Sequence, residues 1–146
     1  ILSDNDDTLY SSGGKFPAGV DKKYPPHVVY PGCCGLMKVL DARGTETECN
    51  LVFLSARPHV YKDVAEEHSH RLFKSLVSEG RMHALPTLIP GSLFRSLFAT
   101  VFYACLKTRA WRMAGDFKYI TYLDYTRLYG EYDFVFCGDN GQGDLL

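Results

Sequence analysis

Short apolar runs alternate along the chain with longer stretches in which apolar residues recur at helical spacing. The runs lie at Ile1–Ser3, Leu51–Leu54 and Phe134–Cys137. Continuous apolar runs of this length are typical of strands in a parallel sheet that is covered by helices on both faces. Because strands that alternate with helices favour such a sheet, we expect an α/β fold.

The stretches between these runs predict helices. The segments and their expected buried residues are 33–40 (Cys33, Leu36, Met37, Leu40), a helix after Leu54 that ends near Gly80 (Val64, His68, Leu72, Phe73, Leu76), and a helix that begins near Asp116 as its N-cap (Phe117, Ile120, Leu123). A further helix is predicted over Leu93–Leu106. Since it is apolar on nearly all sides, we favour a core position over a lipid-facing one. The residues from Tyr10 to Gly32 are rich in Gly, Pro and Lys, which predicts a loop or a short hairpin flap.

The composition fits one compact domain over residues 1–146, of which 46% are hydrophobic and 14% aromatic. A formal net charge of -1 supplies no basic field for nucleic acid, so we expect no nucleic-acid partner. The five Cys residues show no paired spacing, which argues against zinc and disulfides and favours reduced thiols in a cytoplasmic compartment. No apolar run approaches the ~20 residues of a membrane span. Ile1 lies close before the first acidic motif and Leu146 just after the last, so we expect an excerpt truncated at both ends.

Acidic residues follow the first and last predicted strands. Asp4 and Asp6 come directly after Ile1–Ser3, and Asp139 and Asp144 come after the last strand. Since the carboxyl ends of parallel strands face one ligand crevice, these carboxylates are expected to converge. Converging carboxylates repel one another unless a cation lies among them, and an all-oxygen ligand set suits Mg²⁺.

The same residues have the chemistry that phosphoryl transfer requires. Asp4 and Asp6 are two positions apart at a strand end and can point into one space. One can then attack phosphorus while the other handles the leaving-group proton. Mg²⁺ and Lys118 would neutralise the phosphate oxygens, and Ser55, at the end of the second strand, can donate its hydroxyl to one of them.

Each of these residues also has a structural explanation. Asp4–Asp7 can be an acidic turn or helix cap, whereas a calcium loop is excluded because Leu9 and Lys15 occupy the Gly and Glu positions of an EF-hand. Ser55 alone suits a helix cap, Arg57 a surface ion pair, and Lys118 a solvated helix position with Lys107 as its rival. Their occurrence together, in this order and on these elements, favours the functional interpretation.

In this order the motifs resemble those of the haloacid dehalogenase (HAD) superfamily. Asp4-Asn5-Asp6-Asp7-Thr8 after an apolar strand is similar to its DxDxT motif, Ser55 to its second motif, Lys118 to its third, and Gly138-Asp139 with Asp144 to its fourth. The four motifs span almost the whole chain. More narrowly, Leu54–Pro58 and Gly138–Asp144 resemble the catalytic domain of phosphatidate phosphatases of the yeast actin-patch type.

The resemblance implies a Rossmann-like three-layer HAD fold, with a parallel central sheet, a small flap at Tyr10–Gly32 and no large cap. It implies an aspartyl-phosphate intermediate at Asp4, with Asp6 as general acid and then general base. Mg²⁺ would be bound by the Asp4 carboxylate, the Asp6 backbone carbonyl, Asp139 and Asp144. The residues that would contact the transferred phosphate are Ser55, Lys118, Thr8 and Arg57.

The implied reaction is Mg²⁺-dependent hydrolysis of a phosphomonoester, either a phosphorylated small molecule or a phospholipid head group such as that of phosphatidate. A small flap leaves the site open, which favours a bulky substrate or one presented at a surface. A basic cluster around the 93–106 segment could meet anionic head groups in peripheral membrane contact, or form a solvated rim: Arg95, Lys107, Arg109 and Arg112. The alternatives are a non-catalytic HAD-like scaffold and a phospho-acceptor switch. Clustered charge argues against the first, and Asp6 argues against the second.

Overall fold

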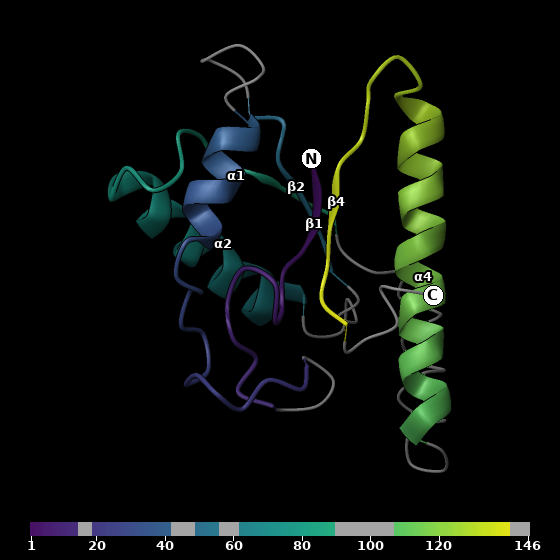
Figure 1. The fold of residues 1–146 in the computed structure, drawn as a ribbon, viewed down its shortest axis with the longest axis horizontal. Helices are drawn as coiled ribbons and strands as arrows, with labels where there is room; N and C mark the ends of the chain where they lie inside the picture. Colours follow the sequence, from purple (N-terminus) through teal and green to yellow (C-terminus); the bar gives the residue numbers. More distant parts are fainter. Residues whose placement is uncertain (15–18, 42–48, 56–61, 90–106, 141–146) are drawn as a thin grey trace.

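A four-stranded parallel sheet forms the centre of the molecule (Figure 1). The computed structural model describes residues 1–14, 19–41, 49–55, 62–89 and 107–140. The strands are β1 (Leu2–Asp4), β2 (Val52–Leu54), β3 (Thr87–Ile89) and β4 (Phe136–Cys137), in the spatial order β3-β2-β1-β4. The predicted α/β class with a parallel sheet is therefore confirmed. The two central strands, β1 and β2, are buried along their whole length. Only β2 is apolar throughout, as is typical of a central strand covered on both faces.

Helices lie on both sides of the sheet. They are α1 (Cys33–Asp41), α2 (Lys62–Ser78) and α4 (Lys107–Leu128). In Figure 1, α1 and α2 lie on one side and α4 lies on the other. Arg57, Asp144 and the helix predicted over 93–106 fall outside the described residues.

Alternation of side chains along β2 divides the apolar core into two clusters. Phe53 faces α1 and α2, and its ring stacks on Phe73 of α2 with centroids 5.0 Å apart. Val52 and Leu54 point the other way, where they join Leu2 in a smaller cluster. Aromatic and apolar residues pack against this second cluster, namely Tyr122 and Tyr125 of α4, Phe134 and Ile89.

Four details of the helix prediction are wrong. On α1, Met37 is buried as predicted, whereas Leu36 is 57% exposed and Cys34, which was not predicted, is buried. On α4, Ile120 is also exposed, because the face that packs on the sheet is carried by Tyr122 and Tyr125. The helix begins at Lys107 rather than near Asp116, because the backbone continues helically through Gly115 and Asp116 instead of starting at a side-chain cap. On α2, Phe73 and Leu76 are buried as predicted, whereas His68 is exposed.

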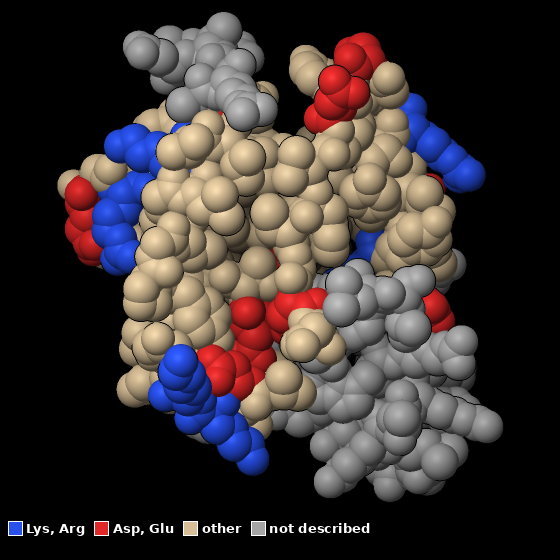
Figure 2. All heavy atoms as spheres, in the orientation of Figure 1, with Lys and Arg blue, Asp and Glu red and all other residues tan. Residues whose placement is uncertain are grey.

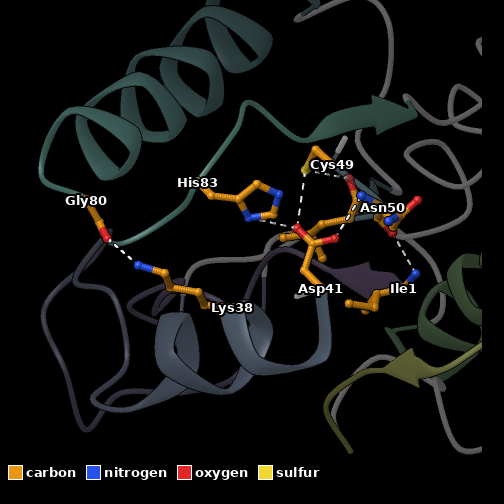
Figure 3. A network of polar contacts seen from close by, with 8 residues as sticks. Ile1, Lys38, Asp41, Cys49, Asn50, Gly80 and His83 are labelled. Atoms are coloured by element: carbon orange, nitrogen blue, oxygen red, sulfur yellow. Dashed lines mark hydrogen bonds and ion pairs between the residues drawn. The ribbon is translucent and has the colours of Figure 1, made fainter. Parts of the chain in front are cut away.

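A network of polar contacts lies where β1 and β2 begin, at the opposite end of the sheet from the predicted site (Figure 3). The buried carboxylate of Asp41, the last residue of α1, accepts the backbone N–H of Asn50 at 2.8 Å and lies 3.3 Å from Nδ1 of His83. The thiol of Cys49 donates to the same carboxylate. The carbonyl of Asn50 accepts the amine of Ile1 at 2.6 Å. These contacts tie the end of α1 to the starts of β1 and β2.

Within the part of the chain that the structure describes, no helix is both long enough and apolar enough to cross a membrane.

Candidate active site

The chain turns sharply where β1 ends, and the turn buries three successive polar residues. Asp4, Asn5 and Asp6 are 2%, 3% and 7% exposed. The Asn5 carbonyl accepts the backbone N–H of Leu9 at 3.0 Å, and Asp7 donates its N–H to the Tyr10 carbonyl at 2.8 Å. We call residues 4–10 the acidic loop. Carboxylates are seldom buried in a simple solvated turn, so this burial favours a functional interpretation over a capping role.

Helix α4 brings a cation directly to the end of β1. The Lys118 ammonium Nζ lies 2.9 Å from Oδ2 of Asp4, and both side chains are at most 5% exposed. Lysine is almost never buried unless it is paired, and the Asp4 carboxylate provides that pairing. The sequence alone left Lys118 with a solvated alternative, which this contact excludes.

Asp6 lies two residues beyond Asp4 and is also buried. The side chain of Asn5, between them, points toward Tyr10 and Ser69. The Asn5 amide donates to the Tyr10 hydroxyl at 3.0 Å and to the Ser69 hydroxyl of α2 at 3.3 Å. Asp6 forms an isolated β-bridge with Tyr10, so its backbone position is also fixed.

Thr8 supplies a buried hydroxyl to the same loop. Its Oγ1 atom is buried and has no hydrogen-bond partner within the described part of the chain. Its carbonyl accepts the Cys33 thiol at 3.2 Å, which anchors the loop to the start of α1. Buried hydroxyls normally have partners. An unsatisfied one beside two carboxylates fits a donor for a bound phosphate oxygen or a water molecule.

The ends of β2 and β4 lie beside the end of β1. Asp4 pairs with Leu54 in the register of β1 and β2, so Ser55 follows one residue beyond the level of Asp4. Ser55 is half-buried and donates its backbone N–H to the carbonyl of Ile89 at 3.0 Å.

On the other side of β1, Ser3 pairs with Cys137, which puts Gly138 level with Asp4 and Asp139 one residue further along. Neighbouring strands lie about 4.8 Å apart. Asp139, which follows the end of β4, therefore lies next to the acidic loop that follows β1. Asp139 is half-buried, with its Oδ2 atom buried. The three predicted strand ends therefore meet at one edge of the sheet.

The donors at this edge are all oxygen atoms, as Mg²⁺ prefers. Among the described residues, no group of three or more His, Cys, Asp and Glu side chains lies close enough together to hold a metal ion. The ligand set that the sequence suggests does not require three such side chains among the described residues. It combines two carboxylates, those of Asp4 and Asp139, with the backbone carbonyl of Asp6. Its fourth member, Asp144, lies outside the described residues. Carboxylate and carbonyl oxygens of this kind suit a hard cation, and the metal set remains a prediction from the sequence.

A half-buried carboxylate, that of Asp7, also organises the flap, which we define as residues 10–32. Asp7 has a left-handed backbone, with φ of 59°, and its Oδ1 atom accepts the N–H of Ser12 at 2.7 Å. Its Oδ2 atom accepts the N–H groups of Val20 and Asp21 at 2.6 and 2.9 Å. A Cβ atom at Gly19 would lie 2.0 Å from Oδ2, so this approach requires glycine. The sequence analysis treated Asp7 only as a motif position. The signal for its role was an Asp directly before a Ser- and Gly-rich segment.

A second carboxylate strengthens this part of the flap. The Tyr30 hydroxyl donates to Oδ2 of Asp21, and Asp21 accepts the backbone N–H of Lys23 through Oδ1 at 2.7 Å. Burial, together with the bond to Asp21, raises the pKa of Tyr30, and the same bond lowers the pKa of Asp21. The described part of the flap contains no helix, which agrees with the loop predicted there.

Acidic side chains gather on one part of the surface. Figure 2 shows them near the centre of the lower half of the face in view, with basic side chains beside them at lower left. In Figure 1, the same part of the view holds the loops that follow β1. Negative charge on this part of the surface would attract a divalent cation.

The structure thus brings the Asp4, Asp6, Thr8 and Lys118 positions together around the end of β1, with Ser55 and Asp139 at the ends of the two neighbouring strands. It does not describe Arg57 or Asp144. No family model, curated protein or solved structure matches this chain.

Proposed function

We propose that this chain is the catalytic domain of a Mg²⁺-dependent phosphatase of the HAD type, in which Asp4 attacks the phosphorus of a phosphomonoester. The observation that carries the proposal is the buried ion pair of Asp4 and Lys118 at the carboxyl edge of a parallel sheet. Ligand sites in open α/β sheets lie at this edge. A buried pair that only served stability would gain little over an apolar pair, which favours a chemical role.

The reaction would proceed in two steps. A carboxylate oxygen of Asp4 forms a bond to phosphorus while the ester P–O bond breaks, and Asp6 gives its proton to the leaving oxygen. A water molecule then attacks the phosphorus, Asp6 takes its proton, and the bond to Asp4 breaks to release inorganic phosphate. The Lys118 ammonium holds the nucleophilic carboxylate in place and faces the negative charge of the incoming phosphate.

Other donors surround the same point. The buried Thr8 hydroxyl and Ser55 at the end of β2 would bind phosphate oxygens. Asp139, Asp144, the Asp4 carboxylate and the Asp6 carbonyl would hold Mg²⁺. When bound, Mg²⁺ would withdraw negative charge from the phosphate oxygens.

The substrate class that we propose is a phosphomonoester at a surface, with phosphatidate first. This rests on the resemblance to phosphatidate phosphatases and on the flap, which exposes Lys22, Lys23 and Val20 beside the acidic loop. Exposed lysines attract anionic lipid. A cytoplasmic enzyme that touches membranes peripherally would follow from this substrate.

The test is phosphate release from an aryl phosphate by the intact protein with Mg²⁺, compared with its Asp4→Asn variant. We expect release from the wild type and its loss in Asp4→Asn. Asp41→Asn is the matched control, because Asp41 is an equally buried aspartate at the opposite end of the sheet. It should retain activity in the folded fraction.

Two results would reject the phosphatase. No release from aryl phosphate, soluble sugar or nucleotide phosphates, or phosphatidate vesicles would favour a non-catalytic scaffold. A single stable phosphorylation of Asp4 without turnover would favour a phospho-acceptor switch. Among active outcomes, preference for vesicles over soluble esters would assign the lipid substrate.

A further inference from the structure

Asn5 lies between the two proposed catalytic carboxylates and is almost completely buried, with 3% of its surface exposed. Its Nδ2 atom donates to the Tyr10 hydroxyl at 3.0 Å and to the Ser69 hydroxyl at 3.3 Å. Both partners are buried as well. A buried amide is unfavourable unless it is hydrogen-bonded, and here the two N–H donors have two partners.

The backbone of Asn5 closes the acidic loop from inside. Its carbonyl accepts the N–H groups of Leu9 and Tyr10, at 3.0 and 3.4 Å. The side chain therefore connects the loop to helix α2 through Ser69, while the main chain holds the loop in its turn. One residue fixes both the shape of the loop and its position on the helix.

Helix α2 holds the flap at the adjacent residue. The His27 ring of the flap lies 4.2 Å from the ring of His68, measured between centroids, and 5.7 Å from the ring of Tyr10. Tyr10 also bridges to Val29 of the flap. The acidic loop and the flap are thus attached to one turn of α2, with Tyr10 between them.

We infer that Asn5 is a positioning residue of this site: its amide clamps the acidic loop to Ser69 and Tyr10 so that Asp4 and Asp6 keep one mutual orientation. The inference rests on the proposed function, since it concerns the reaction of those carboxylates. Displacement of a catalytic group by about 1 Å can lower a rate by about 10²-fold. A loop freed from α2 would permit such displacement, while Ser55 and Lys118, which lie outside the loop, would stay in place to bind the phosphate.

The test removes the two partners and leaves Asn5 and both carboxylates intact. Tyr10→Phe and Ser69→Ala each delete one hydroxyl, and the double variant deletes both. Ser75→Ala is the control, because Ser75 is an exposed residue of the same helix whose hydroxyl bonds Glu79. Aryl phosphate turnover with Mg²⁺ is measured at a temperature where circular dichroism shows every variant to be folded.

We expect kcat to fall about 10-fold in each single variant and about 10²-fold in the double variant, with KM within about 3-fold of wild type. Ser75→Ala should match the wild type. A purely structural role would lower the unfolding temperature and leave the kcat of the folded protein unchanged, and that result would overturn the inference. A higher KM with unchanged kcat would also overturn it.

Wild-type protein that releases no phosphate would reject the proposed function and this inference together. Active wild type with an equally active double variant would reject the inference alone.

Discussion

The Lys118 ammonium and the Asp4 carboxylate form a contact of 2.9 Å between helix α4 and the central strand β1. Each group is removed from water, so each depends on the other for compensation of its charge. The pair also fastens α4 to the sheet at the edge where the proposed chemistry takes place. Stability and the proposed activity would therefore depend on the same two side chains.

The first prediction concerns removal of the cation. Lys118→Met keeps the length of the side chain and leaves the Asp4 carboxylate buried without its ion partner, so the free energy of unfolding should fall by about 3–5 kcal/mol. Urea unfolding followed by circular dichroism measures the loss. Arg71→Met on α2 is the control, because its ion pair with Glu67 is mostly exposed and should contribute little. Adding Asp4→Asn to Lys118→Met should recover part of the loss. Equal effects of Lys118→Met and Arg71→Met would contradict the prediction.

The second prediction concerns the metal. Chelation with EDTA should abolish phosphate release, and added Mg²⁺ should restore it, whereas Ca²⁺ should not, because it takes longer bonds and a less regular ligand geometry. Asp139→Asn should raise the Mg²⁺ concentration needed for half-maximal activity by about tenfold or more. Titration of activity against Mg²⁺ checks this. Full activity in EDTA would remove Mg²⁺ from the mechanism.

The sequence predicts three of the four described strands, including β4 at one edge of the sheet, and misses β3 at the other edge. The apolar run at Leu51–Leu54 corresponds to β2, which is buried on both faces. Strand β3 was not predicted, because Thr87–Ile89 lies at the sheet edge, is only partly buried and has little apolar pattern. The start of α4 was placed too late, since Asp116 has the residue type of a cap but lies exposed within the helix.

The candidate site divides in the same way. Motif spacing predicted that Asp4 and Asp139 would emerge from adjacent places on the sheet, since parallel strands end at one edge. The Lys118 contact depends on how α4 crosses that edge, which local patterns do not encode. The bonds of Asn5 to Ser69 and of Asp7 to Val20 likewise join distant segments, so they became visible only in three dimensions.

The third prediction concerns Gly19, the glycine of the flap that lies against the Asp7 carboxylate. Gly19→Ala would place a methyl group against Oδ2 of Asp7 and should displace the flap, with a cost of about 1–3 kcal/mol. Limited proteolysis should then cut residues 10–32 faster than in the wild type. Gly35→Ala on α1 is the opposite control, because a Cβ there meets no atom within 4 Å. It should stabilise the protein by about 0.5–1 kcal/mol. Unchanged proteolysis in Gly19→Ala would show that Asp7 does not hold the flap.

The fourth prediction concerns alkaline pH. Burial, with a smaller effect of the nearby Cys34 and Cys137, raises the pKa of Cys33 from 9.0 to about 11. The folded protein therefore holds the Cys33 proton more tightly than the unfolded chain does. This contribution to stability is fully present below about pH 9 and is lost as pH rises to about 11.

Cys33→Ser tests this directly. Serine keeps a hydrogen-bond donor toward the Thr8 carbonyl but does not titrate in this range. Urea unfolding measured from pH 8 to pH 11 should show a shallower alkaline decline in Cys33→Ser than in the wild type. Parallel curves would mean that the Cys33 thiol is not responsible for the decline.

The Asp7 carboxylate accepts hydrogen bonds from main-chain N–H groups, and every residue except proline has such a group. The side chains of Val20, Lys22 and Lys23 therefore take no part in the hydrogen bonds to Asp7, and all three residues are exposed. These side chains can be substituted without loss of the hydrogen bonds that attach the flap to Asp7. For the proposed phosphatase, the flap is therefore a suitable segment in which to change substrate preference, because substitutions on its outer surface would leave its attachment through Asp7 intact.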